Sequence, residues 1–227
     1  MQISENWGKL QEAEKKALLL FHEIEQNKLI CSGKSETQIS EEILILAKSK
    51  LGVDVFWHKR IVRAGKNTLC PYKEDPPDLI LKDDDILFLD LGPVFEEWEA
   101  DFGKTYVIGN DPIKLKLKND IETSWISLKK QIQDLPNISA SEVFHLANKE
   151  ATKNGWEFGG EIAGHLIGKY PHEKLEKGNF KYYIHPDNHT KLKENSLNGK
   201  INNHWILELH FVHAEKQIGA FVEGLLF

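Results

Sequence analysis

The chain has 227 residues, of which 41% are hydrophobic, so it is long enough to bury a substantial core. It contains no apolar run of about 18 residues, and the charged start MQISENWGKLQEAEKK lacks the apolar centre of a signal peptide. Both features argue against membrane insertion or export and predict a cytoplasmic protein.

Two further classes have little support. Cys31 and Cys70 are the only cysteines and have no CxxC spacing, which argues against a disulfide framework or a thiolate zinc site. The net charge is -6 and the lysines are scattered, so the sequence does not predict a nucleic-acid surface.

Helical periodicity and capping residues predict most elements in chain order. Two helices lead the chain and form a helical N-terminal part, 1–52, in which Ser35 and Gln38 of SETQ resemble a capping box. A β-like stretch at 53–68 and a strand around ILFLDLG follow, and 172–204 is a polar stretch that we expect to be a long surface excursion. The predicted helices cover 5–26, 35–50, 111–134 and 139–154.

Two predicted hairpins each place acids within apolar strands. A turn centred between Phe95 and Glu96 would set Asp90 opposite Asp101, in the stretch DLGPVFEEWEAD. In the last segment, a turn after Glu215 would likewise set Glu208 opposite Glu223. Like charges across a strand pair repel, and carboxylates among apolar neighbours resist ionisation, so a bound cation would resolve the conflict. The structural alternative is that these acids lie at sheet edges or face solvent.

A nitrogen ligand is available in GEIAGHLIGKYPHE. His165 stands there between Gly164 and Gly168, which permit close backbone approach, and His172 follows seven residues later. A histidine in an apolar stretch also suits an ordinary core position. Oxygen-rich sites with a histidine suit divalent manganese, iron or cobalt, and two ions can share bridging carboxylates.

The order of Asp90, Asp101, GHxIG with a second histidine, and two terminal glutamates resembles the pita-bread metallopeptidases: methionine aminopeptidase, Xaa-Pro aminopeptidase, prolidase and creatinase. The resemblance spans about Val53 to Phe227. It implies an α+β pita-bread fold, with an antiparallel sheet and helices packed on its outer face. It also implies one catalytic domain, 1–227, without the separate N-terminal domain of creatinase.

The same resemblance implies a role for each matching residue. Asp90 would chelate one metal ion, Asp101 and Glu223 would bridge two, and His165 and Glu208 would complete the site. In that family a metal-bridging water or hydroxide attacks the peptide carbonyl, while the acid at the position of Glu208 shuttles its proton. The two ions would be manganese first, with cobalt, iron or zinc as alternatives.

Several departures bear on the substrate. Relatives usually have a histidine shortly before the first aspartate, where this chain has LCPYKEDPP, so Tyr72 and the more distant His58 are candidate substrate contacts. The resemblance implies that His172 is a catalytic residue that contacts the substrate near its scissile carbonyl. Leu209 replaces the usual proline after the first glutamate, and the final hairpin is short.

The activity predicted from this resemblance is a dinuclear-metal aminopeptidase, of Xaa-Pro type because NTLCPYKEDPP is more similar to that group. The alternatives are a pita-bread enzyme acting on a small non-peptide molecule and a binding module without catalysis. The expected partner is a peptide or small-molecule substrate, with no nucleic acid or membrane, and a homodimer is one assembly the sequence allows.

Overall fold

A computed structural model describes residues 5–171, 180–193 and 203–227. All four predicted helices are present, and the capping box of Ser35 and Gln38 is confirmed, because each residue bonds the other's backbone. The elements in chain order are α1 (Glu5–Gln26), α2 (Glu36–Leu51), β1 (Ile61–Ala64), η1 (Gly65–Leu69), β2 (Asp85–Leu91), β3 (Val94–Phe95), β4 (Trp98–Glu99), β5 (Phe102–Ile108), α3 (Pro112–Asp134), α4 (Ala140–Lys153), β6 (Glu157–Phe158), β7 (Leu166–Ile167), η2 (Phe180–Tyr182), β8 (His204–His213) and β9 (Ile218–Leu225).

The described strands form an antiparallel sheet of seven, in the order β1-β2-β5-β9-β8-β6, with β7 also paired to β8. Strands β3 and β4 form a separate two-stranded ribbon between β2 and β5. The α+β class with an antiparallel sheet is therefore confirmed.

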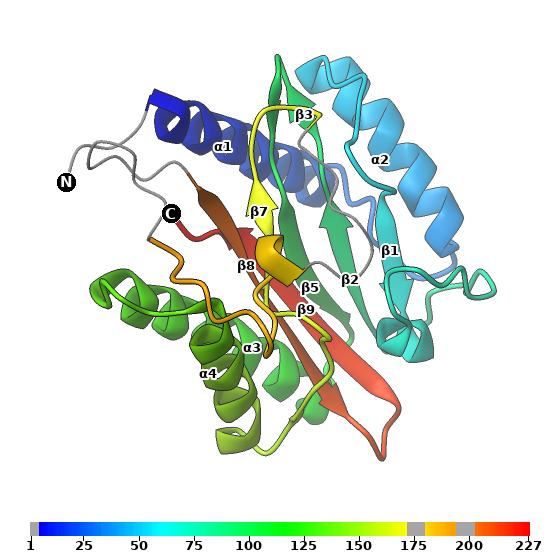
Figure 1. The fold of residues 1–227 in the computed structure, drawn as a ribbon. Helices are drawn as coiled ribbons and strands as arrows, with labels where there is room; N and C mark the ends of the chain where they lie inside the picture. Colours follow the sequence, from blue (N-terminus) through cyan, green and yellow to red (C-terminus); the bar gives the residue numbers. More distant parts are fainter. Residues whose placement is uncertain (1–4, 172–179, 194–202) are drawn as a thin grey trace.

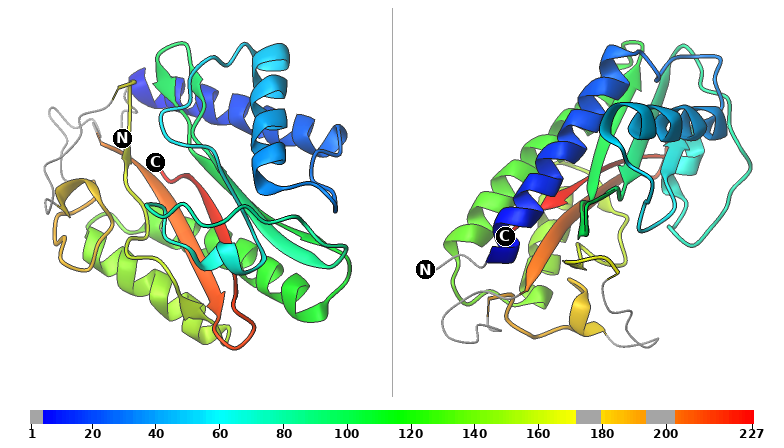
Figure 2. Two further views of the ribbon diagram at one scale, coloured as in Figure 1. Left: turned by 90° about the vertical axis from the view of Figure 1, so that its right-hand side faces the viewer. Right: turned by 90° about the horizontal axis from the view of Figure 1, so that it is seen from above.

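The helices cover one face of this sheet (Figures 1 and 2). Leu87 and Leu89 of β2 pack into a core with α1 and α2, while Leu207 and Leu209 of β8 pack into a second core with α3 and α4. Because side chains alternate along a strand, the residues between these leucines point to the other face. Asp90 of β2 and Glu208 of β8 alternate with these leucines and therefore lie on the face that the helices leave free.

Two sequence expectations need correction. In the β-like stretch 53–68 only Ile61–Ala64 is a strand, and the turn-rich residues after it form the 3-10 helix η1. Much of 172–204 lies outside the described residues, but the described part is not all surface: Ile184 and Leu192 are buried in the core with α3 and α4. Isolated apolar residues in a polar stretch were enough to anchor it.

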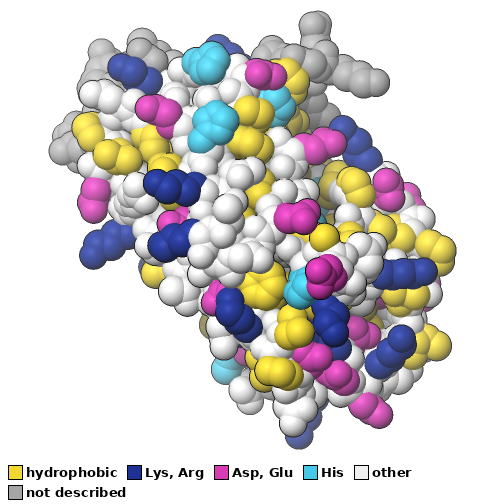
Figure 3. Space-filling view, turned by 90° about the horizontal axis from the view of Figure 1, so that it is seen from below, with side chains coloured by type: hydrophobic (Ala, Val, Ile, Leu, Met, Phe, Trp, Pro, Cys, Tyr) yellow, Lys and Arg dark blue, Asp and Glu magenta, His cyan; other side chains and the backbone are white. Residues whose placement is uncertain are grey.

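The outer surface mixes charges. On the face seen from below in Figure 3, basic and acidic side chains are interspersed with hydrophobic ones, so no field of one sign covers that face. Of the helices in the described part of the chain, none combines the length and apolar character needed to cross a membrane.

Candidate metal centre

Three acids and one glycine occupy paired positions across four neighbouring strands. Asp90 on β2 pairs with Gly103 on β5, Gly103 pairs with Glu223 on β9, and Glu223 pairs with Glu208 on β8. Directly paired residues point to the same face of a sheet, so the three carboxylates share the face without helices. The predicted opposition of Glu208 and Glu223 is confirmed.

Gly103 leaves room within this set of paired positions. A Cβ atom at this position would lie 2.7 Å from Phe221 Cε1 and 3.0 Å from Glu223 Cγ. Separations under about 3 Å force a shift of the neighbouring atoms, so a side chain at Gly103 would press on one of the acids. The glycine therefore lets the carboxylates of β2 and β9 approach each other.

The predicted opposition of Asp90 and Asp101 is wrong by two residues. Asp90 pairs with Gly103, and the same register continues in the ribbon, where Val94 pairs with Glu99. A shift of two residues keeps every side chain on its face, whereas a shift of one would reverse it. Asp101, just before β5, therefore still joins the other acids, and it is 3% exposed.

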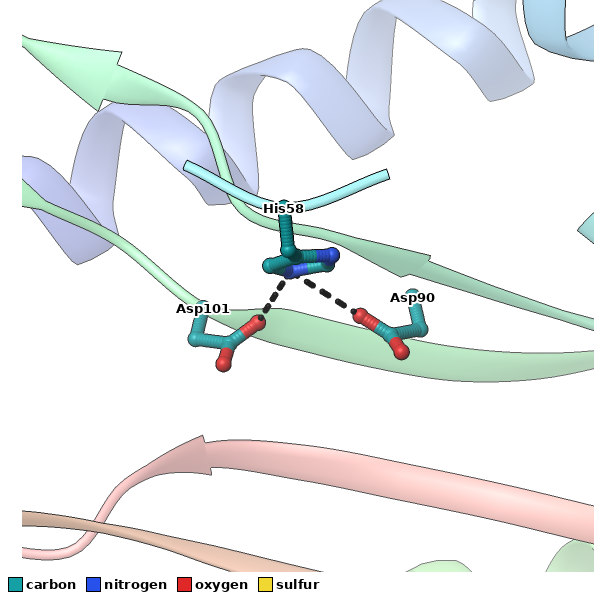
Figure 4. A group of neighbouring side chains, drawn as sticks. All are labelled: His58, Asp90 and Asp101. Carbon is teal, nitrogen blue, oxygen red and sulfur yellow. Dashed lines mark hydrogen bonds and ion pairs between the residues drawn. The ribbon is translucent and has the colours of Figure 1, made fainter. Parts of the chain in front are cut away.

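Two imidazoles contact Asp101 from opposite sides. His58 Nε2 lies 3.2 Å from Asp101 Oδ1 and 3.3 Å from Asp90 Oδ1; Figure 4 shows this ring between the two aspartates. His165 Nε2 lies 3.0 Å from the other oxygen, Asp101 Oδ2. Each Asp101 oxygen thus faces one histidine nitrogen.

The loop of His165 reaches the sheet because of Gly164. This residue has φ +142°, and a Cβ there would lie only 2.0 Å from the Ile206 carbonyl oxygen. The close approach allows Ile206 N–H to bond the His165 carbonyl at 2.8 Å. The role predicted for Gly164 is confirmed, whereas Gly168 has no atom within 4 Å of such a Cβ and is not needed for packing.

Asp101 and the two imidazoles that contact it favour their charged forms. Burial alone would lower the pKa of His58, but the charges of Asp90 and Asp101 outweigh it and raise the pKa to about 9. Burial alone would also lower the pKa of His165, but its contact with Asp101 raises that pKa to about 9. Burial would raise the pKa of Asp101, but the two imidazoles lower it to about 2.

The other carboxyls resist ionisation. Burial raises the pKa of Glu208 to about 8, with the charges of Asp90 and Asp101 adding to the effect. Burial and the same two aspartates raise the pKa of Glu223 well above its usual range, and burial also raises that of Asp90. A cation placed among them would favour the ionised forms.

The residues present fit a divalent metal centre. Two groups each offer three ligand atoms within 4.8 Å of one another: His58 with Asp90 and Asp101, and His165 with Asp101 and Glu223. Asp90 Oδ1 and Glu223 Oε1 are buried without a hydrogen-bond partner, although such atoms are normally satisfied. Carboxylate oxygens with imidazole nitrogens suit first-row divalent ions, and the two groups share Asp101.

The structure brings together most of the predicted site residues. Asp90, Asp101, His165 and Glu223 fall within the two ligand groups, and Glu208 is paired with Glu223 beside them. Of the candidate substrate contacts, the Tyr72 ring lies 6.0 Å from the His58 ring and is 52% exposed. His172 lies outside the described residues.

Sequence reasoning placed His58 with the substrate contacts and missed its contact with both aspartates. The residue lies in FWHKR, 32 positions before Asp90 and outside both hairpins, so strand pairing gave no signal for it. Trp57, which packs against both histidine rings, was also missed.

Residues 8–198 match the Metallopeptidase family M24. The chain belongs to this family. The sequence match ends before β8 and β9, but the structural likeness described next extends over them. Membership places the chain among the metallopeptidases, which agrees with the candidate metal centre.

Solved structures share the pita-bread fold. Prolidase from Thermococcus sibiricus superposes with a TM-score of 0.75 at 21% identity, covering 96% of this chain and 55% of its own. X-Pro aminopeptidase from Thermotoga maritima gives 0.74 at 19%, covering 97% and 60%. Methionine aminopeptidase from Rickettsia prowazekii gives 0.72 at 16%, covering 99% and 94%. These likenesses confirm the predicted fold.

The M24 chain spans less than two thirds of the length of the prolidase and X-Pro aminopeptidase that it resembles. No curated protein sequence is similar enough to count as a match. At these identities the likeness establishes the fold, and substrate choice has to be argued from the chain's own residues.

Proposed function

We propose that this M24 protein is a dinuclear-metal aminopeptidase that removes the N-terminal residue of peptides, with preference for Xaa-Pro bonds, and that residues 1–227 form one catalytic domain. The observation that carries the proposal is the position of Asp101. Its two oxygens face different ligand groups, one with His58 and Asp90 and the other with His165. A carboxylate placed in this way can bridge two ions.

The residues divide into holders and a proton carrier. Asp90 would hold one ion, Asp101 and Glu223 would bridge, and His165 with Glu208 would complete the second position. When bound, such a pair of ions supplies a water of lowered pKa and polarises the scissile carbonyl. Manganese is our first choice, with cobalt, iron and zinc as the alternatives.

Glu208 is suited to move the proton. It pairs with Glu223 beside the two ligand groups, so its carboxylate would lie next to the water that the ions hold. A carboxylate at this position can accept the proton of the attacking water and return it to the leaving amine. Tyr72 and His172 are the side chains that we propose to contact the substrate near the scissile bond.

The preference for proline rests on sequence. The segment NTLCPYKEDPP differs from that of methionine aminopeptidases, and two of the structures with similar folds are a prolidase and an X-Pro aminopeptidase. Because a methionine aminopeptidase shares the fold equally well, the substrate has to be decided by assay.

The test uses chelator-treated protein reloaded with manganese, cobalt, iron(II) or zinc. We expect release of the N-terminal residue from Gly-Pro or Ala-Pro substrates and little turnover of Met-Ala-Ser. Glu208→Gln should lower kcat by at least about a hundredfold, as for loss of a general base. Glu215→Gln is the matched control, because Glu215 is an exposed acid in the turn of the same hairpin. Turnover of Met-Ala-Ser alone would reverse the specificity, and turnover of no peptide would favour a small-molecule substrate.

A further inference from the structure

His58 is held against the two aspartates by backbone contacts from a separate loop. Trp57 N–H donates to the Gly92 carbonyl at 2.8 Å, and the Trp57 indole N–H donates to the Ala100 carbonyl at 3.0 Å. A Cβ at Gly92 would lie 2.3 Å from His58 Cδ2, so the ring rests directly on that glycine. Trp57 therefore holds the loop of His58 to both ends of the segment that runs from Asp90 to Asp101.

The orientation of His58 matches that of His165. His58 Nδ1 lies 2.7 Å from the carbonyl oxygen of the next residue, Lys59, and His165 Nδ1 lies 2.9 Å from the carbonyl of its next residue, Leu166. An Nδ1–H that donates to a carbonyl leaves the Nε2 lone pair of a neutral ring free, and metal-binding histidines are commonly fixed in this way. In both residues Nε2 points at Asp101.

The distances around His58 suit one metal ion. Ligand atoms that share an ion at about 2.1 Å lie roughly 3.0 to 3.4 Å apart in octahedral or tetrahedral geometry. His58 Nε2 is 3.3 Å from Asp90 Oδ1 and 3.2 Å from Asp101 Oδ1. Asp90 Oδ1 has no hydrogen-bond partner, so its lone pairs are free to bind an ion. An ion bound by these three atoms would satisfy the oxygen.

Burial separates His58 from a typical substrate contact. Its side chain is 5% exposed, whereas the neighbouring Tyr72 is 52% exposed. Within the described residues, the polar atoms nearest its Nε2 are the two aspartate oxygens. The ring is therefore placed to act on the carboxylates.

We propose that His58 Nε2 is a ligand of the ion held by Asp90 and Asp101, so that each ion of the pair is bound by one imidazole. This rests on the proposed dinuclear centre. His58 would give the ion at Asp90 a nitrogen donor in place of an all-oxygen set, as His165 does for the other ion.

The test is cobalt(II) binding to the metal-free protein, followed by proton NMR and visible absorption. A ring Nδ1–H of a cobalt-bound histidine gives a strongly shifted, solvent-exchangeable signal. We expect two such signals and two ions per chain in the wild type. His58→Ala and His165→Ala should each lose one signal, and His58→Ala should weaken one ion by at least about tenfold. His145→Ala, which removes an exposed histidine on α4, is the matched control.

Each other outcome overturns a defined claim. If the wild type binds no cobalt, the dinuclear centre and this inference fall together. If it binds two ions with one ring signal, the dinuclear centre stands and His58 is no ligand; this wild-type reading holds even where a variant folds poorly. If the wild type binds one ion and His58→Ala or His58→Gln gains a second, His58 is a counter-ion that takes the place of a metal. Unchanged occupancy with a raised KM in His58→Ala would restore the substrate role.

Discussion

The two acid-bearing hairpins of this M24 protein neutralise their carboxylates in different ways. On the central hairpin, β2 and β5, Asp101 contacts two imidazoles, and its pKa is lowered to about 2. On the terminal hairpin, β8 and β9, one acid is paired directly with another, and burial raises the pKa of Glu208 to about 8. Asp101 is charged and paired with imidazoles, whereas both glutamates of the terminal hairpin favour their protonated forms.

The difference shows what a metal ion has to do. On the central hairpin an ion would compete with imidazolium protons for Asp101, which is already ionised, while burial raises the pKa of Asp90. On the terminal hairpin it would displace the protons of Glu208 and Glu223. Metal binding is thus coupled to proton release at both hairpins, and the apparent affinity depends on pH.

The largest effect should come from Asp101→Asn, which removes the charge at the centre of the site. Ions binding only the folded state stabilise it by about 2.7 kcal/mol at a hundredfold excess over Kd, and we expect the variant to lose most of this gain. It should also lower the free energy of unfolding of the metal-free protein by about 3 kcal/mol, because it breaks a buried ion pair. This value is at the low end for such a change, since the imidazoles left without a partner can lose their protons. Opposed acids alone would predict no loss, so the sign distinguishes pairing from repulsion.

The measurement is thermal and urea unfolding of chelator-treated protein with and without manganese. Asp83→Asn, at an exposed acid just before β2, is the control. An equal manganese shift in wild type and Asp101→Asn would show that Asp101 is no ligand. A metal-free variant as stable as wild type would show that its imidazole contacts contribute nothing.

The pH dependence of the metal-free protein tests both hairpins together. The imidazoles have an ordinary pKa of 6.5 and a folded pKa of about 9, so their stabilisation is complete below pH 6.5 and is lost as the pH rises through 9. Glu208, raised to about 8 from 4.5, binds a proton in the folded state that the unfolded chain releases, which acts in the same direction. Asp101, lowered to about 2 from 3.8, acts oppositely, and its contribution is lost as the pH falls through 2.

We therefore expect the free energy of unfolding without metal to fall by about 2 kcal/mol or more between pH 5.5 and 9. Added manganese should oppose this fall, because the ligands must be deprotonated, and its gain should grow from about pH 5 towards 7.5. Urea unfolding at four pH values, with Glu215→Gln as control, gives the profile. A flat metal-free profile would contradict the raised pKa values on both hairpins.

Substitution of the glycine between the hairpins gives a smaller effect. Gly103→Ala would place a Cβ 2.7 Å from Phe221 Cε1, and overpacking of this kind costs about 1 to 3 kcal/mol. It should also weaken manganese binding, since Glu223 has to move. Gly168→Ala is the matched control, because nothing lies within 4 Å of its added Cβ. Equal stability of the two variants in thermal unfolding would show that β5 and β9 can separate without cost.

The same comparison shows how far sequence reasoning reaches. The terminal hairpin is one uninterrupted pair of strands, so the index of its turn gave the pairing of Glu208 with Glu223 correctly. The central hairpin keeps one register from the Asp90–Gly103 pair through the ribbon β3–β4, but its turn is centred between Glu96 and Glu97, one residue later than the sequence suggested, so the pairing of Asp90 was missed by two. Alternation of side chains still gave the right face, which is why the acids were found.

Tertiary contacts were beyond local patterns. The capping box of Ser35 and Gln38 and the apolar periodicity predicted the helices, because those signals lie within a few residues. The position of His58 depends instead on Trp57 bonding Gly92 and Ala100, residues far along the chain. The burial of Leu192 depends on packing against α3 and α4 in the same way. Long-range packing decides both, and spacing in the sequence does not record it.

The smallest effect concerns the turns, where the hairpins are alike. Glu96, after β3, and Gln217, before β9, both have left-handed backbone, with φ 61° and 53°. This conformation costs a residue with a side chain about 1 kcal/mol, whereas glycine adopts it freely. Glycine also loses more chain entropy on folding, so we expect each glycine substitution to stabilise the folded protein by only about 0.5 kcal/mol. Glu96→Gly also removes an exposed contact with Lys16 at 3.3 Å, so its gain should be the smaller. Lys216→Gly, at a neighbouring turn residue with ordinary φ, should instead destabilise. Because the turns are remote from the carboxylates, urea unfolding should give the same gain in stability with and without manganese. A gain that disappears when manganese is bound would show that ion binding already stabilises the hairpins as far as their turns.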